Sequence, residues 1–306
     1  MTTLRVSVLT AIGMLAALAP RSAAAAPCCM SATAFGIGRL LIWEDFALGL
    51  RTSLAPGLGA WDDEGRWQPW SAYDETEWRS EVWGIVGLDR RASLFLRVPA
   101  VMLARSVPGQ GDVGGGIGDV SAGLRYELVA IGEYLELPAI ALTLAVLAPT
   151  GRSPEEARTD LAVDVTGRGA WVLSAGLSLE HTVLPWFVRL DVGASVPMPQ
   201  ARDDLGVDQR LGVSVDVALS GGVEVDDGIV LSLVPRLTWT DATRLDEEVV
   251  DGSSRLDVGV GFAASWRLDP HWTLQAALDA PVPIDGLGKN QPGRLLTTLG
   301  LRYGSF

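Results

Sequence analysis

The chain has 306 residues, a formal net charge of −13 and two cysteines. This acidic balance argues against a nucleic-acid partner, because no basic stripe is present to neutralise phosphates. The cysteines, Cys28 and Cys29, are adjacent, so they cannot staple distant segments together, and they are too few for a zinc site. We interpret them as a strained vicinal disulfide or as free thiols, and we expect neither a metal nor a cofactor.

The first 26 residues have the pattern of a secretory signal peptide. Arg5 supplies a basic start, an apolar run extends from Val6 to Ala19, and small residues lead to a cleavage context near Ala26. A retained N-terminal anchor is the alternative, but the apolar run is short for a membrane span. We therefore predict an exported chain with a signal peptide at 1–26, a periplasmic tail at 27–43 and one large domain at 44–306.

The large domain is built from segments in which every second residue is apolar. Between Gly118 and Leu128, for example, apolar side chains alternate with charged or small ones. Because side chains alternate across a strand, such a segment is a strand with one apolar and one polar face. The pattern predicts twelve strands, near residues 45–54, 73–88, 94–100, 118–128, 138–148, 171–180, 186–195, 211–219, 231–239, 256–266, 272–279 and 295–303.

The connections between these strands alternate in length. Short turns, such as Asp89–Arg91, alternate with long and mostly acidic loops, such as 61–72, 197–210 and 241–253. An even number of strands with short turns at one end and long loops at the other is typical of a transmembrane β-barrel. A soluble sheet would show the same alternation within each strand but not this rhythm of connections. We predict a single antiparallel barrel in the outer membrane of a Gram-negative cell.

Aromatic residues on the apolar face gather at strand ends. Amphipathic rings prefer the headgroup level of a bilayer, so this placement favours two belts on a lipid-facing wall. The predicted belts contain Trp171 and Trp239 at the long-loop ends, and Tyr126, Trp186, Trp266, Trp272 and Tyr303 at the short-turn ends.

The opposite face would line the lumen. Opposed arginines and carboxylates there could form a constriction that selects solutes by charge and size. They could equally bond to one another and fill a narrow barrel. Opposite charges two positions apart suggest this for three pairs: Arg125 and Glu127, Arg189 and Asp191, and Arg255 and Asp257. The candidates are Arg51, Arg97, Asp119, Arg125, Glu127, Glu180, Arg189, Asp191, Asp216, Arg236, Asp257, Gln275 and Asp279.

Three further features concern the loops and the C-terminus. The glycines of 114–118 could let a loop fold into the pore or could form a flexible surface loop. The acidic loops could bind divalent cations shared with lipopolysaccharide or could simply be solvated, and no EF-hand spacing is present. The terminal aromatic Phe306 is of the kind that barrel-assembly machinery reads, but its parity is opposite to that of Tyr303, so a bulge near Gly304 would be needed to restore the phase.

Two short motifs carry a family resemblance. Residues 116–126, with Gly116-Ile117-Gly118-Asp119 and Gly123-Leu124-Arg125-Tyr126, resemble the bacterial outer-membrane proteins of the MetA-pathway phenol-degradation family, as does Leu147-Ala148-Pro149-Thr150-Gly151. The resemblance implies a barrel channel for small molecules, hydrophobic or aromatic ones among them. It carries over no substrate-binding residue.

Three classes of function fit a barrel of this kind. The first is a porin-like channel for passive passage of an unidentified solute, with outer-membrane lipid, lipopolysaccharide and the assembly machinery as partners. The second is a structural or adhesive barrel with a closed lumen. The third, a lipase-type enzyme, needs a histidine beside a serine and an orienting polar residue. His181 and His271 lie beside short turns, so we predict no catalytic residue.

Overall fold

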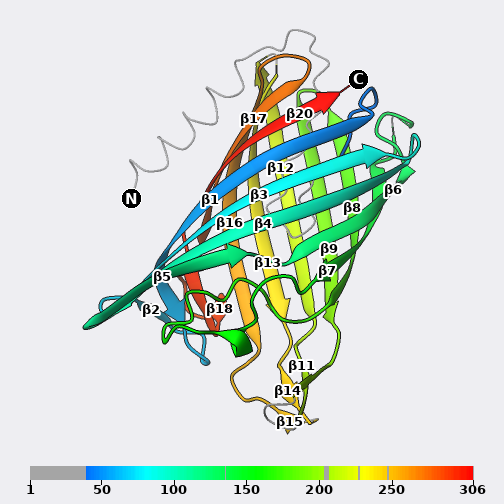
Figure 1. Cartoon of the computed structure of the whole chain (residues 1–306). Coiled ribbons are helices and arrows are strands. Elements are labelled where there is room, and N and C mark those ends of the chain that lie inside the picture. The colour runs from blue at the N-terminus through cyan, green and yellow to red at the C-terminus, as the bar shows by residue number, and fades with distance from the viewer. Residues whose placement is uncertain (1–38, 135, 203–206, 227, 247, 306) are drawn as a thin grey trace, which may run out of the picture.

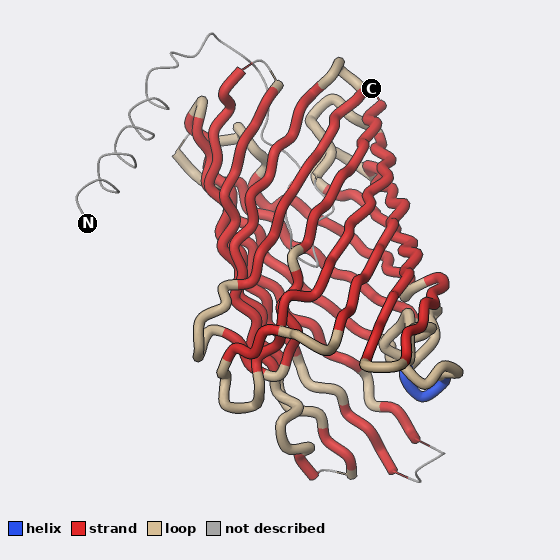
Figure 2. The backbone as a smooth tube through the Cα atoms, turned by 90° about the vertical axis from the view of Figure 1, so that its left-hand side faces the viewer, coloured by secondary structure: helices blue, strands red, loops and turns tan. Residues whose placement is uncertain are grey.

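The computed structural model describes residues 39–134, 136–202, 207–226, 228–246 and 248–305. The predicted signal peptide, the cysteine pair and Phe306 lie outside these residues. Most of the described chain is extended, and its strands are inclined to the long axis of a closed barrel (Figures 1 and 2). Within this part of the chain, no helix is long and apolar enough to cross a membrane.

Among the described residues, twelve antiparallel strands form the barrel wall, as the alternation predicts. Each pairs with its neighbour, and β13 pairs with β16 to close the ring, so the wall leaves no open edge. In spatial order from β13, the strands are β13 (Ile229–Thr240), β12 (Ser214–Asp226), β9 (Trp186–Pro197), β8 (Val172–Val183), β7 (Ala139–Ala148), β6 (Val120–Val129), β4 (Ala92–Val107), β3 (Asp74–Gly87), β1 (Phe46–Trp61), β20 (Leu296–Ser305), β17 (Trp272–Pro281) and β16 (Arg255–Arg267).

The long connections contain further secondary structure at one end of the barrel, here called the long-loop end. The opposite end, where the short turns lie, is called the short-turn end. Two of these connections form a four-stranded sheet, and others add short strands to the barrel sheet, where the sequence pattern predicts loops (Figure 1). The additional elements are β2 (Trp67–Pro69), β5 (Gln110–Ile117), the 3-10 helix η1 (Pro154–Glu156), β10 (Gln200–Arg202), β11 (Val207–Arg210), β14 (Arg244–Leu245), β15 (Glu248–Val249), β18 (Gly288–Lys289) and β19 (Gln291–Arg294).

The glycine-rich segment near residue 114 adopts a structure that differs from both alternatives predicted for it. Gly114 to Ile117 belong to β5 and pair with β4, so the segment extends the sheet and neither enters the pore nor forms an irregular loop. The segment that folds inward is the connection at 149–171, where Val163 and Ala170 are fully buried. At the C-terminus, β20 pairs with β1 in unbroken register to Ser305, so no bulge occurs near Gly304.

The two faces of the wall differ as the period-2 pattern requires. Outward side chains such as Val82, Leu144 and Phe262 are each about 60% exposed, which makes the outer surface a continuous apolar band. Inward side chains include many polar and charged ones together with buried apolar ones, and Ala47, Trp83, Ile85 and Phe95 pack into a small internal core. This core lies within the barrel, so it narrows the lumen.

Candidate functional site: the barrel lumen

The thirteen predicted lumen residues lie in two groups inside the barrel. Their contact with a solute stays a prediction. One group belongs to an ion-pair network towards the short-turn end and contains Arg125, Glu127, Glu180, Arg189 and Asp191. The other group lines two cavities and contains Arg51, Arg97, Asp119, Asp216, Arg236, Asp257, Gln275 and Asp279.

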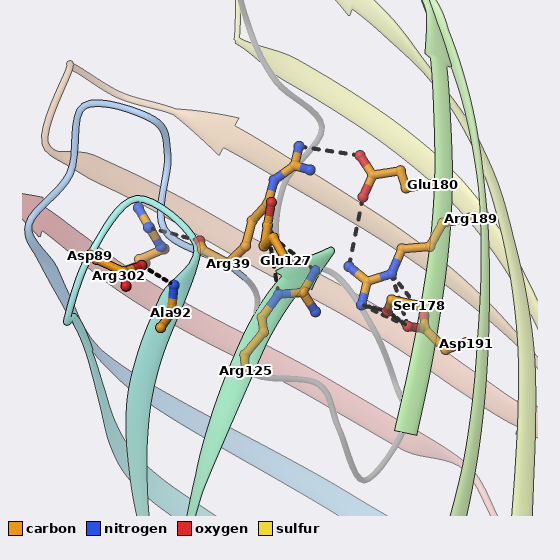
Figure 3. A network of polar contacts seen from close by, with 10 residues as sticks. All are labelled: Arg39, Asp89, Ala92, Arg125, Glu127, Ser178, Glu180, Arg189, Asp191 and Arg302. Carbon is orange, nitrogen blue, oxygen red and sulfur yellow. Dashed lines mark hydrogen bonds and ion pairs between the residues drawn. The ribbon is translucent and has the colours of Figure 1, made fainter. Parts of the chain in front are cut away.

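The ion-pair network lies inside the barrel towards the short-turn end (Figure 3). The Arg189 guanidinium donates to Asp191 at 2.8 Å, and its Nη1 lies 4.0 Å from a Glu180 oxygen. The Ser178 hydroxyl also donates to Asp191, and Arg125 donates to Glu127 at 3.4 Å. The side chains of the Arg189 pairs are about 95% buried, so this part of the lumen is densely filled. Two pairs predicted from i, i+2 spacing are therefore present.

The segment that precedes β1 joins this network from inside the barrel. Arg39 lies 3.2 Å from Glu180, and both side chains are buried. Five residues later, Glu44 accepts a hydrogen bond from Arg302 of β20 at 2.7 Å, with side chains only 1% and 3% exposed. Leu40 packs against the internal apolar core. Residues 39–45, here called the N-terminal strap, are thus held across the lumen by two buried ion pairs.

Two adjoining cavities occupy the lumen towards the long-loop end. The first has a volume of about 530 Å³ and lies mainly against β1, β16, β17 and β19. The second has a volume of about 460 Å³ and lies mainly against β3 and β4, and also against residues of β7, β8, β12 and β13, with the connection at 149–171 on one side. Glu77 and Arg79 of β3 line both cavities, so these two residues mark their junction.

Around the first cavity, Arg236 is the centre of a three-residue cluster. It donates to Asp279 at 2.6 Å and to Asp257. Gly259, opposite Arg236 on β16, leaves room for this arrangement, because a Cβ there would contact the guanidinium. Asp257 was predicted to pair with Arg255, and this prediction is wrong, because the guanidinium that reaches it comes from the adjacent strand β13.

Asp119 has a structural role at the mouth of the second cavity. Its carboxylate accepts hydrogen bonds from the backbone N–H groups of Gly151 at 3.0 Å and Arg168 at 2.7 Å. The Thr150 hydroxyl donates to the Gly118 carbonyl at 2.8 Å. The two sequence motifs that carry the family resemblance are therefore in direct contact, and together they hold the connection at 149–171 in the lumen.

Several charged lumen residues were missed from the sequence. A signal for those on β3 was present, since they alternate along the strand and share the parity of the internal Trp83. Their outward neighbours include Thr76 and Ser80, which weakened the apolar pattern. Arg39 and Arg168 lie outside regular strands, where alternation carries no information. The missed residues are Arg39, Glu44, Glu75, Glu77, Arg79, Glu81, Arg168, Arg294 and Arg302.

The predicted belt residues face outward, and their lipid contact stays a prediction. Six of them are between 38% and 53% exposed, and Tyr303 is half-buried beneath Trp272, with ring centroids 5.1 Å apart. Trp78, at 48% exposure, is a further outward tryptophan that the pattern missed. His271 stacks on Tyr303, with ring centroids 5.6 Å apart, and Nδ1 contacts the Gly304 carbonyl at 2.9 Å.

Comparison with known proteins supports the fold. No protein-family model matches the chain. The COG4313 outer membrane channel from Pseudomonas putida F1 superposes with a TM-score of 0.72 at 18% identity, over 87% of this chain and 97% of that one. The translocator domain of the autotransporter NalP from Neisseria meningitidis reaches a TM-score of 0.48 at 13% identity, over 85% and 88%. The barrel architecture is therefore shared with an outer-membrane protein of known structure.

Proposed function

We propose that the chain is an outer-membrane channel for the passive passage of small molecules, hydrophobic or aromatic ones among them. One observation carries the proposal: a closed barrel with an apolar outer wall encloses two adjoining cavities of about 530 and 460 Å³ lined by charged and hydroxyl side chains. An apolar exterior requires a lipid surround, and a charged interior requires water. In this proposal the signal peptide is removed on export, the short-turn end faces the periplasm and the long-loop end faces the outside.

The solute class rests on two supports. The fold is shared with a protein described as an outer membrane channel, and two contacting motifs resemble the MetA-pathway phenol-degradation family. Both cavities also contain apolar lining, such as Phe95 and Leu147 in the second. A small aromatic solute is therefore a suitable first candidate.

A single-channel measurement tests the proposal. The mature chain is refolded, its folding is checked by heat-modifiable gel mobility, and it is added to a planar bilayer. We expect steady current steps, and in liposome-swelling assays we expect entry of phenol. Folded protein that gives no current at any voltage and admits no phenol would contradict the channel.

A barrel with a closed lumen is the second candidate, and the N-terminal strap favours it. Buried ion pairs such as Arg39–Glu180 leave little space for solute at the periplasmic end. In the channel proposal, passage requires the strap to move. A structural barrel would instead keep it seated, and the folded mature chain would then give no current steps in the bilayer.

A further inference from the structure

The charge of the two cavities differs from that of the whole chain. Seven arginines and six carboxylates line them, whereas the chain as a whole has a formal net charge of −13. Cationic groups are thus concentrated inside a strongly acidic protein. What matters for binding is which of these charges already have partners.

Every carboxylate that lines the cavities accepts a hydrogen bond from the protein. Glu81 accepts one from Arg51 at 2.6 Å, and Asp216 accepts one from the Thr238 hydroxyl at 2.7 Å. The remaining four are Glu77, which accepts from Arg79 and Arg294, Asp257 and Asp279, which accept from Arg236, and Asp119, which accepts from backbone N–H groups. The acidic side of the lumen is therefore internally satisfied.

Three arginines that line the cavities have no carboxylate partner among the described residues. Among the described residues, no carboxylate oxygen lies within 4.0 Å of the guanidinium nitrogens of Arg97, Arg168 or Arg255. Arg97 uses one nitrogen, Nε, to donate to the Ser121 hydroxyl at 2.8 Å. Arg168 and Arg255 are exposed to the lumen. Their guanidinium groups are therefore available to a solute.

The three cations line the two adjoining cavities. Enclosure inside the barrel lowers the pKa of Arg168 below its ordinary value, and the charges of Arg255 and Arg79 lower it further, although Asp119 and Asp216 act in the opposite direction. Arg79 lies at the junction of the cavities, Arg97 and Arg168 line the second cavity, and Arg255 lines the first. An anion at the junction would relieve this repulsion without displacing an existing ion pair.

We propose that Arg97, Arg168 and Arg255 form a binding site for the carboxylate group of small organic anions. The proposal rests on the channel function and names a solute class for it. The planar guanidinium presents paired N–H donors that match the two oxygens of a carboxylate. The apolar side chains of Phe95, Leu147 and Val165 line the second cavity together with Arg97 and Arg168, and they receive the uncharged part of the solute.

Benzoate and phenol are the probes, because they share a ring and differ in charge. Calorimetric titration of the folded, detergent-solubilised barrel should give tighter binding of benzoate than of phenol. Arg168→Gln should weaken benzoate binding about tenfold, the order expected for one lost charge-assisted hydrogen bond, and should leave phenol binding unchanged. The Asp119 contact uses the backbone N–H of residue 168, so the substitution keeps that contact.

Arg255→Gln provides a second variant on the other side of the junction, in case Arg168→Gln fails to fold. Arg90→Gln, an exposed residue of a short turn, is the matched control and should bind benzoate as the wild type does. Equal affinity for benzoate and phenol, or unchanged benzoate affinity in both lumen variants, would overturn the site. Bilayer recordings separate the two proposals, since a silent barrel that still binds benzoate through Arg168 overturns the channel and leaves the site standing.

Discussion

Replacing Glu44 by glutamine should release the N-terminal strap from the lumen. The carboxylate accepts a hydrogen bond from Arg302 and another from the backbone N–H of Leu41, each at 2.7 Å. Glutamine keeps the length of the side chain and an acceptor for Leu41, so the substitution removes mainly the charge. Because Glu44 and Arg302 are 1% and 3% exposed, water does little to compensate for the loss.

The expected cost follows from this burial. Removing one partner of a buried ion pair costs about 3 kcal/mol at the lower end of the usual range, which corresponds to about a hundredfold change in the ratio of seated to released strap. Gly304→Ala should act in the same direction, because a Cβ at residue 304 would collide with the Glu44 carboxylate. Both variants should increase single-channel conductance and speed amide hydrogen exchange in residues 40–45.

Two further variants test whether the buried charge is responsible. Glu64→Gln changes a carboxylate whose side chain is 64% exposed at the long-loop end, so it should leave conductance and exchange unchanged. The double variant Glu44→Gln/Arg302→Gln should be less damaging than the sum of its single substitutions, because it leaves no uncompensated buried cation. Wild-type conductance together with wild-type exchange in Glu44→Gln would refute the reasoning that this ion pair holds the strap.

Three other predictions concern the wall, the selectivity and the inward connection. Gly49→Ala should lower the temperature of the heat-induced gel-mobility shift, because its Cβ would collide with the Trp83 indole, whereas Gly221→Ala, with open space around it, should not. Arg236→Gln leaves its two aspartate partners unpaired, so the reversal potential in a KCl gradient should shift towards cation selectivity; an unchanged potential would contradict this. Burial raises the pKa of Asp164, but hydrogen bonds from its own loop outweigh this and lower the pKa to about 2. That carboxylate therefore stabilises the connection at 149–171 fully above its ordinary pKa of 3.8, and this stabilisation is lost as the pH falls through about 2. Amide hydrogen exchange of the connection, measured across this pH range, checks the prediction. In Asp164→Asn the exchange should be fast at every pH.

The lumen combines two different environments, and this affects how a solute would pass. Near the long-loop end, cavities with unmatched arginines leave room for binding. Near the short-turn end, buried pairs such as Arg189–Asp191 and the strap leave little room. Binding and passage are therefore separable properties, and the titration and bilayer experiments measure them independently.

The sequence by itself determined the wall of this protein. Alternation with period 2 is a local property, so it correctly predicted the twelve strands of the barrel wall. The long-short rhythm of the connections predicted which end carries the loops. Even the missed residues of β3, Glu75 to Glu81, follow the same alternation, which their polar outward neighbours obscured.

Only the tertiary structure decided which charges meet. Asp257 lies two residues from Arg255, yet the register of β13 against β16 and the small Gly259 bring Arg236 to it instead, and this leaves Arg255 facing the lumen. The strap and the inward connection at 149–171 have no periodicity to read, and their positions depend on contacts between distant segments, such as the Glu44–Arg302 ion pair and the two backbone hydrogen bonds to Asp119. The face on which a side chain lies follows from local strand geometry. The partner with which a charged side chain pairs depends on the register between distant segments, and this pairing decides what the lumen can bind.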